Sequence, residues 1–214
     1  MIRVEPADEP ESFEKNVRQP GLRALAELAG EKNLPKRKGR PRKAIADSRE
    51  AIPADKFPPY WTNTLPELRE AYKHICCYVS IYIEPITGAA SVDHMLPKSL
   101  SWRDAYEWQN YRLACSLMNS RKNDYRDVLD PFEIGDGWFQ LELVGYQVIP
   151  RVGLDPEVEQ RVQATIDRLR LNDWDCLKSR EDYAANYFGK DISFDYLRRR
   201  SPFLAGEIER QGRK

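Results

Sequence analysis

The stretch that decides the fold is Ser91-Val92-Asp93-His94-Met95-Leu96-Pro97-Lys98, in which an Asp-His pair closes an apolar segment. Pro97 biases Leu96 towards an extended backbone, so the chain should leave a strand as a loop just past the histidine. Two polar positions follow: Asn110, two residues after a tryptophan, and Asn119, three residues before a lysine. Together these pieces predict one compact unit of strand, loop and helix.

The same features coincide in the HNH nuclease motif, which residues 56–135 resemble. The matching details are an Asp before the His, a Pro three residues after it, a Trp two before the middle Asn and a Lys three after the last Asn. Such a motif is a hypothesis whose structural context must fit. The resemblance implies an α+β fold: a ββα-metal core with flanking helices and, in this chain, an additional C-terminal β-hairpin.

The HNH resemblance implies a metal-dependent endonuclease that hydrolyses phosphodiester bonds of nucleic acid, with DNA as the expected substrate. Such cleavage needs a water nucleophile, a base for its proton, and positive charge on the phosphate. His94 fits the base because the unperturbed pKa of histidine lies near neutrality. Asp93 and Asn119 offer the hard oxygens that suit Mg²⁺ or Mn²⁺. Asn110 completes the catalytic set, mainly as a clamp of the loop.

Local patterns predict the elements that carry these residues. The β-branched and aromatic run 77–83 predicts a first strand, and turn residues at 84–88 lead to a second strand at 89–92. Helical spacing of apolar residues predicts a helix from 111 to about 123, with Asn119 on it. Successive strand residues point to opposite faces, so Asp93 and His94 cannot project alike unless the strand end twists.

The cysteines concern a second metal. Many HNH relatives bind a structural zinc through two Cys-x-x-Cys pairs, whereas this chain has one cysteine and one apolar residue in each pair of slots: Cys76, Val79, Cys115 and Met118. Zinc in structural sites needs four N or S ligands, so we expect no structural zinc. His74 or Cys77 would be the substitutes if a zinc were held. Cys176 lies far along the chain and is expected to be a buried small hydrophobe.

A basic segment precedes the motif region. It contains seven cations and no acid: Lys32, Lys36, Arg37, Lys38, Arg40, Arg42 and Lys43. Its core, Gly39-Arg40-Pro41, resembles an AT-hook, which lies along the minor groove of A·T-rich DNA. The alternative is a solvated basic linker that attracts phosphates without regard to sequence. Both alternatives predict nucleic-acid binding by the last six of these cations, joined near the motif by Lys98, Arg121 and Lys122.

Composition bounds the class of protein. The 214 residues carry a formal net charge of zero and 32% charged side chains. No apolar run reaches the length of a membrane span, and four cysteines without a signal peptide favour a reducing compartment. We therefore expect a cytoplasmic protein with no membrane contact. Its expected segments are an N-terminal helical segment (1–31), a basic flexible linker (32–55), the HNH core (56–135), and a hairpin followed by helices (136–214).

The flanking sequence predicts further elements before and after the motif. Before it are a helix within 11–30 interrupted at Pro20-Gly21 and a Thr64-x-x-Glu67 capping box for a helix to about 75. After it are a hairpin at 137–149 turning at Gly145, an amphipathic helix at 155–171, and helical segments at 183–188 and from 201 onwards.

The aromatic entry at 57–62 and the distal helices resemble HNH proteins of bacterial anti-phage defence systems of the Septu type, which implies a partner ATPase. Two rival classes are a catalytically lapsed, HNH-derived DNA-binding or adaptor protein, and a structural interaction module.

Overall fold

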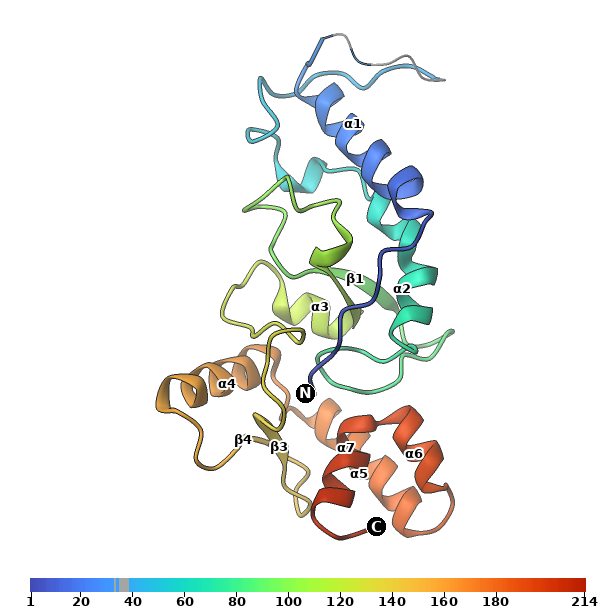
Figure 1. The fold of residues 1–214 in the computed structure, drawn as a ribbon, viewed down its shortest axis with the longest axis vertical. Helices are drawn as coiled ribbons and strands as arrows, with labels where there is room; N and C mark the ends of the chain where they lie inside the picture. The colour runs from blue at the N-terminus through green and yellow to red at the C-terminus, as the bar shows by residue number, and fades with distance from the viewer. Residues whose placement is uncertain (33, 35–38) are drawn as a thin grey trace.

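The fold is mixed α/β. The computed structural model describes residues 1–32, 34 and 39–214, and within them it contains seven α-helices and two small antiparallel sheets (Figure 1). The helices are α1 (Gln19–Leu28), α2 (Leu65–Ala71), α3 (Ser116–Lys122), α4 (Pro156–Leu169), α5 (Trp174–Phe188), α6 (Phe194–Arg200) and α7 (Pro202–Arg210). The strands are β1 (Ala90–His94), β2 (Tyr111–Cys115), β3 (Phe139–Leu141) and β4 (Val148–Pro150).

The centre of the molecule is the unit formed by β1, β2 and α3. The two strands are antiparallel, with Asp93 opposite Arg112 and His94 opposite Tyr111, and β2 passes directly into α3. The expected helix from 111 was wrong for its first five residues, because these form β2. The strand is buried over most of its length, and a short, fully buried apolar run has no periodicity that separates strand from helix.

The run 77–83, expected as a strand, is instead a tight turn. Ser80 donates its backbone N–H to the Cys76 carbonyl at 2.9 Å, and the backbone φ of Ser80 is +54°. Pairing in this region is limited to an isolated bridge between Ile75 and Tyr82. The β-branched and aromatic composition reflects burial of the turn: Tyr78, for example, is fully buried.

The N-terminal region differs from the expectation in two details. Pro20 is the second residue of α1, which directly continues a π-helix at Glu14–Arg18. The helical backbone therefore runs through Pro20-Gly21, and only its hydrogen-bond pattern changes just before the proline. A Cβ on Gly21 would come within 2.4 Å of the Tyr106 ring, so glycine is required for this packing. The predicted capping box was also wrong: Thr64 makes no side-chain cap bond, and the Glu67 carboxylate accepts from Ser12 at 3.1 Å.

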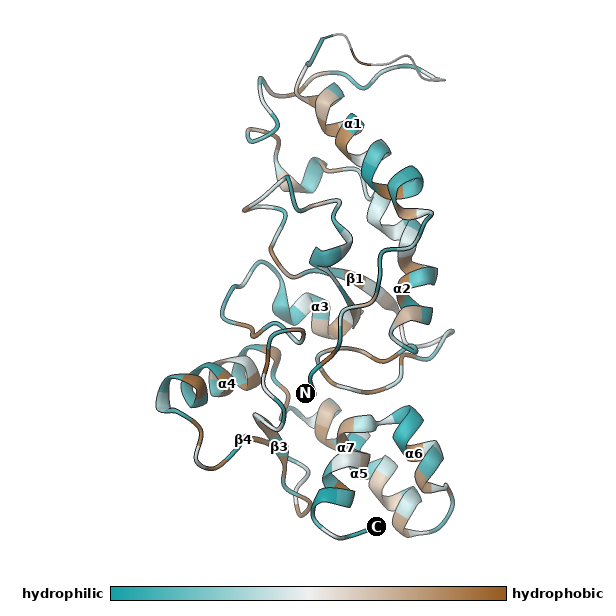
Figure 2. Cartoon of the chain, in the orientation of Figure 1, coloured by the Kyte–Doolittle hydropathy of each residue, from teal (hydrophilic) through white to brown (hydrophobic). Residues whose placement is uncertain are grey.

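The C-terminal region follows the sequence pattern at its hairpin, at α4 and at α7. The predicted segment 183–188 covers only the end of α5, and α6 was not predicted. Strands β3 and β4 form the predicted hairpin, and α4 begins at the predicted place, capped by the Asp155 carboxylate, which accepts from the Glu157 N–H at 2.9 Å. Hydrophobic and hydrophilic residues alternate around α4 (Figure 2), as expected of a helix with one buried face. Within the described part of the chain, no helix is both long and apolar enough to cross a bilayer.

One hydrophobic core connects these regions. Its buried members extend from Met1 to Ile208 and include Leu113 of β2 and Met118 of α3. Helices α5, α6 and α7 gather at the end of the molecule opposite α1, with β1 and α3 between them (Figure 1). The β1–β2–α3 unit is therefore supported from both ends by packed elements.

Candidate functional site

The predicted site residues meet at a cavity of about 380 Å³ beside the end of β1. The cavity is lined by Trp61, Ser91, Val92, Asp93, His94, Pro97, Lys98, Ser116, Asn119, Ser120, Asn123 and Asp124. Four predicted residues, Asp93, His94, Lys98 and Asn119, are thus brought together from β1, the following loop and α3. Asn110 is not among the lining residues.

His94 is held with one ring nitrogen directed at the protein. Its Nε2 lies 2.9 Å from the Ala105 carbonyl oxygen, and a carbonyl can only accept, so Nε2 carries the proton. The ring packs edge-on against Trp61 and Tyr111, with centroid separations of 4.9 and 5.1 Å. Burial lowers the pKa of His94 to about 3, so at neutral pH the imidazole is uncharged and Nδ1 is a proton acceptor.

Nδ1 of His94 makes no hydrogen bond to any described residue, and it is not one of the fully buried polar atoms that lack a partner. It therefore reaches the cavity. A neutral histidine with Nε2–H fixed by a carbonyl and Nδ1 facing a cavity has the geometry of a general base.

Asn110 acts on the loop that follows β1. Its Oδ1 accepts from the Leu96 N–H at 2.7 Å, and its Nδ2 donates to the carbonyls of Leu96 and Asp104, both at 3.0 Å. These bonds close the loop that carries the Ala105 carbonyl and hence the His94 ring. The predicted clamp role fits this geometry. Direct participation in catalysis does not, because the side chain lies outside the cavity lining.

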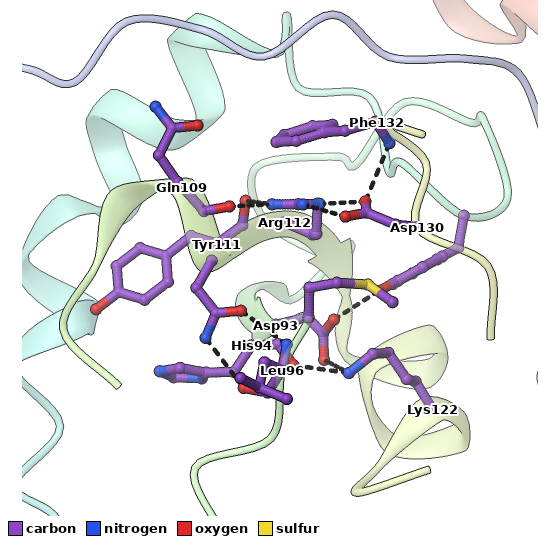
Figure 3. A network of polar contacts seen from close by, with 12 residues as sticks. Asp93, His94, Leu96, Gln109, Tyr111, Arg112, Lys122, Asp130 and Phe132 are labelled. Carbon is purple, nitrogen blue, oxygen red and sulfur yellow. Dashed lines mark hydrogen bonds and ion pairs between the residues drawn. The ribbon is translucent and has the colours of Figure 1, made fainter. Parts of the chain in front are cut away.

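Asp93 points away from His94, as alternation along a strand requires (Figure 3). Its Oδ2 accepts from the Tyr78 hydroxyl at 2.6 Å, and its Oδ1 lies 3.2 Å from the Lys122 ammonium. Burial raises the pKa of Asp93 above its usual range, while the Lys122 charge opposes that rise. The carboxylate is almost fully buried and already has a cation and a hydroxyl as partners.

Two cations predicted to bind nucleic acid have internal roles instead. Lys122 has no exposed surface and also donates to the His94 carbonyl at 2.7 Å, which places it beneath β1 (Figure 3). Arg121 donates to the Leu169 and Arg170 carbonyls at 3.1 and 3.0 Å, joining α3 to the end of α4. Both predictions are corrected: cations that are satisfied by internal carbonyls and carboxylates are poorly placed to meet phosphates.

Asn119 presents a hard oxygen to the cavity. Its Nδ2 donates to the Ser91 hydroxyl at 3.1 Å and to the Val92 carbonyl at 3.4 Å. These two acceptors fix the amide orientation, so Oδ1 is the atom left for a cation. Asn123, one helical turn further on, and Asp124 line the same cavity. Sequence reasoning missed both, although an i,i+4 spacing from Asn119 could have pointed to Asn123.

The donors around this cavity suit a hard divalent cation. Asp93, Asn119, Asn123 and Asp124 offer carboxylate and amide oxygens, the ligand type that Mg²⁺ and Mn²⁺ prefer. Within the described residues, no cluster of three or more His, Cys, Asp or Glu side chains is placed to hold a metal. A site here would depend on amide oxygens and on water for much of its coordination, as is common for Mg²⁺.

Lys98 and Trp61 form the opposite wall. The Lys98 ammonium lies 4.5 Å from the centroid of the Trp61 ring, a cation–π distance. Partial burial lowers the pKa of Lys98, and Asp124 opposes that effect. Trp61 therefore positions both the His94 ring and a cation that faces the same cavity, a role that sequence reasoning missed.

A further ion pair fixes β2. Arg112, opposite Asp93, forms a two-pronged pair with Asp130 and donates to the Gln109 carbonyl at 2.7 Å (Figure 3). Its guanidinium stacks over the Phe132 ring, 3.4 Å from the centroid. This network joins the residues just before β2 to the segment after α3, which supports the loop clamped by Asn110.

The four positions that the HNH resemblance identified as zinc slots surround a second cavity, of about 180 Å³. Cys76, Val79, Cys115 and Met118 all line it. Cys176 of α5, far along the chain, lines it as well, and this residue is buried as expected. His74 is bonded to Arg69 and Glu70, and neither His74 nor Cys77 lines this cavity.

The basic segment is described only in part. Lys36, Arg37 and Lys38 lie outside the described residues. Arg42 is docked against α1: it donates to the Glu27 carboxylate at 3.1 Å and to the Tyr60 hydroxyl at 3.0 Å. Arg40 and Lys43 are exposed. The choice between hook and linker stays a prediction.

Comparison with known proteins adds no identification. No protein-family model matches this chain, and a search of the curated proteins finds no similar sequence. Its function must therefore be argued from the geometry of the site.

Proposed function

We propose that this protein is a metal-dependent endonuclease of the HNH type that hydrolyses phosphodiester bonds of nucleic acid, with DNA as the first candidate. The observation that carries the proposal is the state of His94: neutral, with Nε2–H tied to the Ala105 carbonyl and Nδ1 open to a polar cavity. A structural histidine would use both nitrogens or face apolar surroundings.

The residues divide into four roles. His94 Nδ1 takes the proton of the attacking water, a contribution of roughly 10²–10⁴ in rate. Asp93 and Asn119 would hold Mg²⁺ or Mn²⁺, which supplies positive charge to the phosphate and the leaving oxygen. Lys98, on the opposite wall, is placed to contact a phosphate oxygen. Asn110, Trp61 and Tyr111 position the His94 ring through the contacts described above.

The proposal extends to the biological role of the nuclease. The resemblance of the flanking sequence to HNH proteins of Septu-type defence systems suggests a role against phage and a partner ATPase. The exposed cations Arg40 and Lys43 would add phosphate attraction outside the cavity.

One observation favours a second candidate, a catalytically lapsed protein that only binds DNA. Both carboxylate oxygens of Asp93 already have partners, and one of them is the Lys122 ammonium. A cation that stands against a metal ligand would compete with the metal. Because Tyr78 and Lys122 each contact a different oxygen, the remaining lone pairs still allow metal coordination, so we favour the active enzyme.

Supercoiled plasmid tests both candidates. Purified protein with Mg²⁺ or Mn²⁺ should nick or linearise it, and a chelator should stop the reaction. His94→Ala should lower the rate by roughly 10²–10⁴ and leave DNA affinity intact. The matched control is His74→Ala, the other histidine of the chain, which should cut as the wild type does. Cleavage by His94→Ala within a few-fold of wild type would remove the proposed base, and DNA binding without any metal-dependent cleavage would favour the lapsed protein.

A further inference from the structure

Two cysteines, Cys76 and Cys115, line the smaller cavity together. Cys76 lies in the turn before β1, and Cys115 ends β2, 39 residues later. The Cys115 N–H donates to Cys76 Sγ at 3.4 Å. This contact makes the two side chains neighbours, which a disulfide between them requires.

The two thiols are chemically unequal. Cys76 is fully buried, and burial raises its pKa. Cys115 is half-buried at the N-cap of α3, and the neighbouring Cys76 thiol and the backbone N–H groups of Met118 and Leu117 lower its pKa. A low-pKa, accessible thiolate is the reactive partner in a cysteine pair, and a buried neighbour is the resolving one.

Access to the sulfurs is open. The cavity of about 180 Å³ that Cys76 and Cys115 line is large enough for a hydroperoxide. Its other walls are mostly apolar, among them Val79, Ile83 and Met118. None of the four cysteines is in a disulfide, so both thiols of this pair are available.

We propose that Cys76 and Cys115 form a reversible oxidation site that a hydroperoxide converts to a disulfide. The Cys115 thiolate attacks the peroxide: an S–O bond forms, the O–O bond breaks, and the alkoxide leaves, to be protonated by water. The Cys76 sulfur then attacks the sulfenic acid at Cys115. The S–S bond forms as the S–O bond breaks, and the departing hydroxide takes the Cys76 proton as water.

The bond would replace, with one covalent link, the junction that a zinc makes in the resembling proteins. It would tie the turn at 76–80 to the point where β2 becomes α3. Closing a loop of this length constrains the unfolded chain, so the oxidised protein should melt roughly 5–10 °C above the reduced protein. The proposal does not depend on nuclease activity.

Peptide mapping of the full-length wild-type protein tests it without any variant. Reduced protein is treated with stoichiometric hydrogen peroxide at neutral pH, the remaining thiols are alkylated, and linked peptides are identified. We expect one linkage, Cys76 to Cys115, with the loss of two hydrogens, full reversal by dithiothreitol and the rise in melting temperature. Linkage through Cys77 or Cys176, linkage only between molecules, or Cys115 oxidised without any linkage would each overturn the proposal.

Two variants separate the roles of the sulfurs. Cys76→Ser should leave Cys115 oxidised to a sulfenic acid that a dimedone probe captures, with no rise in melting temperature. Cys176→Ser is the matched control, because this third thiol lines the same cavity, and it should form the linkage at the wild-type rate. Loss of the linkage in Cys176→Ser would contradict the assignment. So would one zinc per chain in the reduced protein, because a bound metal would occupy both thiols.

Discussion

Two cavities flank the same β1–β2–α3 unit, and two neighbouring residues of α3 each line a different one of them. Asn119 lines the larger cavity with His94 and Asp93, whereas Met118 lines the smaller one with Cys76 and Cys115. In the first, the polar positions of the HNH motif are occupied by polar groups with defined partners. In the second, half of the ligand slots are apolar.

The two cavities differ in how freely their residues can be exchanged. A structural metal can be replaced by apolar packing, because any side chains that fill the space and exclude water hold the elements together. In this chain Val79 and Met118 line a cavity of about 180 Å³ and pack against a continuous core. A cavity that binds a cation and a phosphate has no such substitute, because hard oxygens and a proton acceptor must be in place.

The largest expected effect comes from adding two thiols to the smaller cavity. Val79→Cys together with Met118→Cys supplies the two missing thiolates beside Cys76 and Cys115. Tetrahedral zinc should then bind, with an apparent free energy of about 10–16 kcal/mol as in small zinc domains. Elemental analysis should find one zinc per chain in the double variant and none in the wild type. Equal zinc contents would show that the four slots do not define this cavity's chemistry.

The next effect concerns the ion pair beneath the larger cavity. Lys122→Met leaves the Asp93 carboxylate buried without its cation, which should lower the free energy of unfolding by about 3–5 kcal/mol. Urea denaturation measures the change. Lys178→Met is the matched control, since Lys178 pairs with Asp182 on the surface at 2.9 Å, and it should leave the free energy of unfolding nearly unchanged. If Lys122→Met changed the free energy of unfolding as little as this control does, Asp93 would not be charged in the folded protein.

Acid should weaken the same region through His94. Its folded-state pKa is about 3, below the ordinary value of 6.5, so the unfolded chain binds the proton more readily. The resulting stability is fully present above pH 6.5 and is lost as the pH falls towards 3, on the order of 2–4 kcal/mol.

Measuring the wild type beside His94→Gln separates the pH dependence due to His94 from that of the carboxylates, which both proteins share. The difference in unfolding free energy between wild type and variant should shrink steadily from pH 7 to pH 4. A difference independent of pH would contradict the buried, neutral state of the ring.

The smallest effect compares adjacent positions of α3. Asn119→Ala should weaken Mg²⁺ binding by roughly 10–100-fold, by analogy with losses around metal sites, and cleavage should recover partly at high metal concentration. Met118→Ala should instead lower stability by about 2–5 kcal/mol and leave Mg²⁺ affinity unchanged. Calorimetric titration with Mg²⁺ and urea denaturation of both variants test the pair. The same profile for both residues would contradict the division between the two cavities.

Much of the framework was predictable from local sequence. The hairpin of β3 and β4 and the helix α4 follow from alternation, turn residues and an Asp cap, all of which act within a few residues. The meeting of Asp93, His94 and Asn119 also follows, because a strand end and a nearby helix leave few ways to pack. The opposite directions of Asp93 and His94 come directly from strand geometry.

Other features needed the tertiary structure. Whether 111–115 is strand or helix was decided by pairing with β1, since an apolar run that is buried all round has no periodicity of its own. Lys122 looked like a surface cation because charge in a sequence does not specify burial. Only the fold places Asp93 and the His94 carbonyl against its ammonium. Cys176 reaches the cavity of Cys115 from α5, a contact between distant segments.

The sequence by itself thus determined which groups could perform the chemistry and the elements that carry most of them. The tertiary structure decided which face each group uses: His94 Nδ1 towards the cavity, Lys122 beneath β1, and the thiols of Cys76 and Cys115 against each other. The physical reason is that residue type and local spacing fix reactivity and secondary structure within a few positions. Burial, partners and pKa depend on which distant segments pack together.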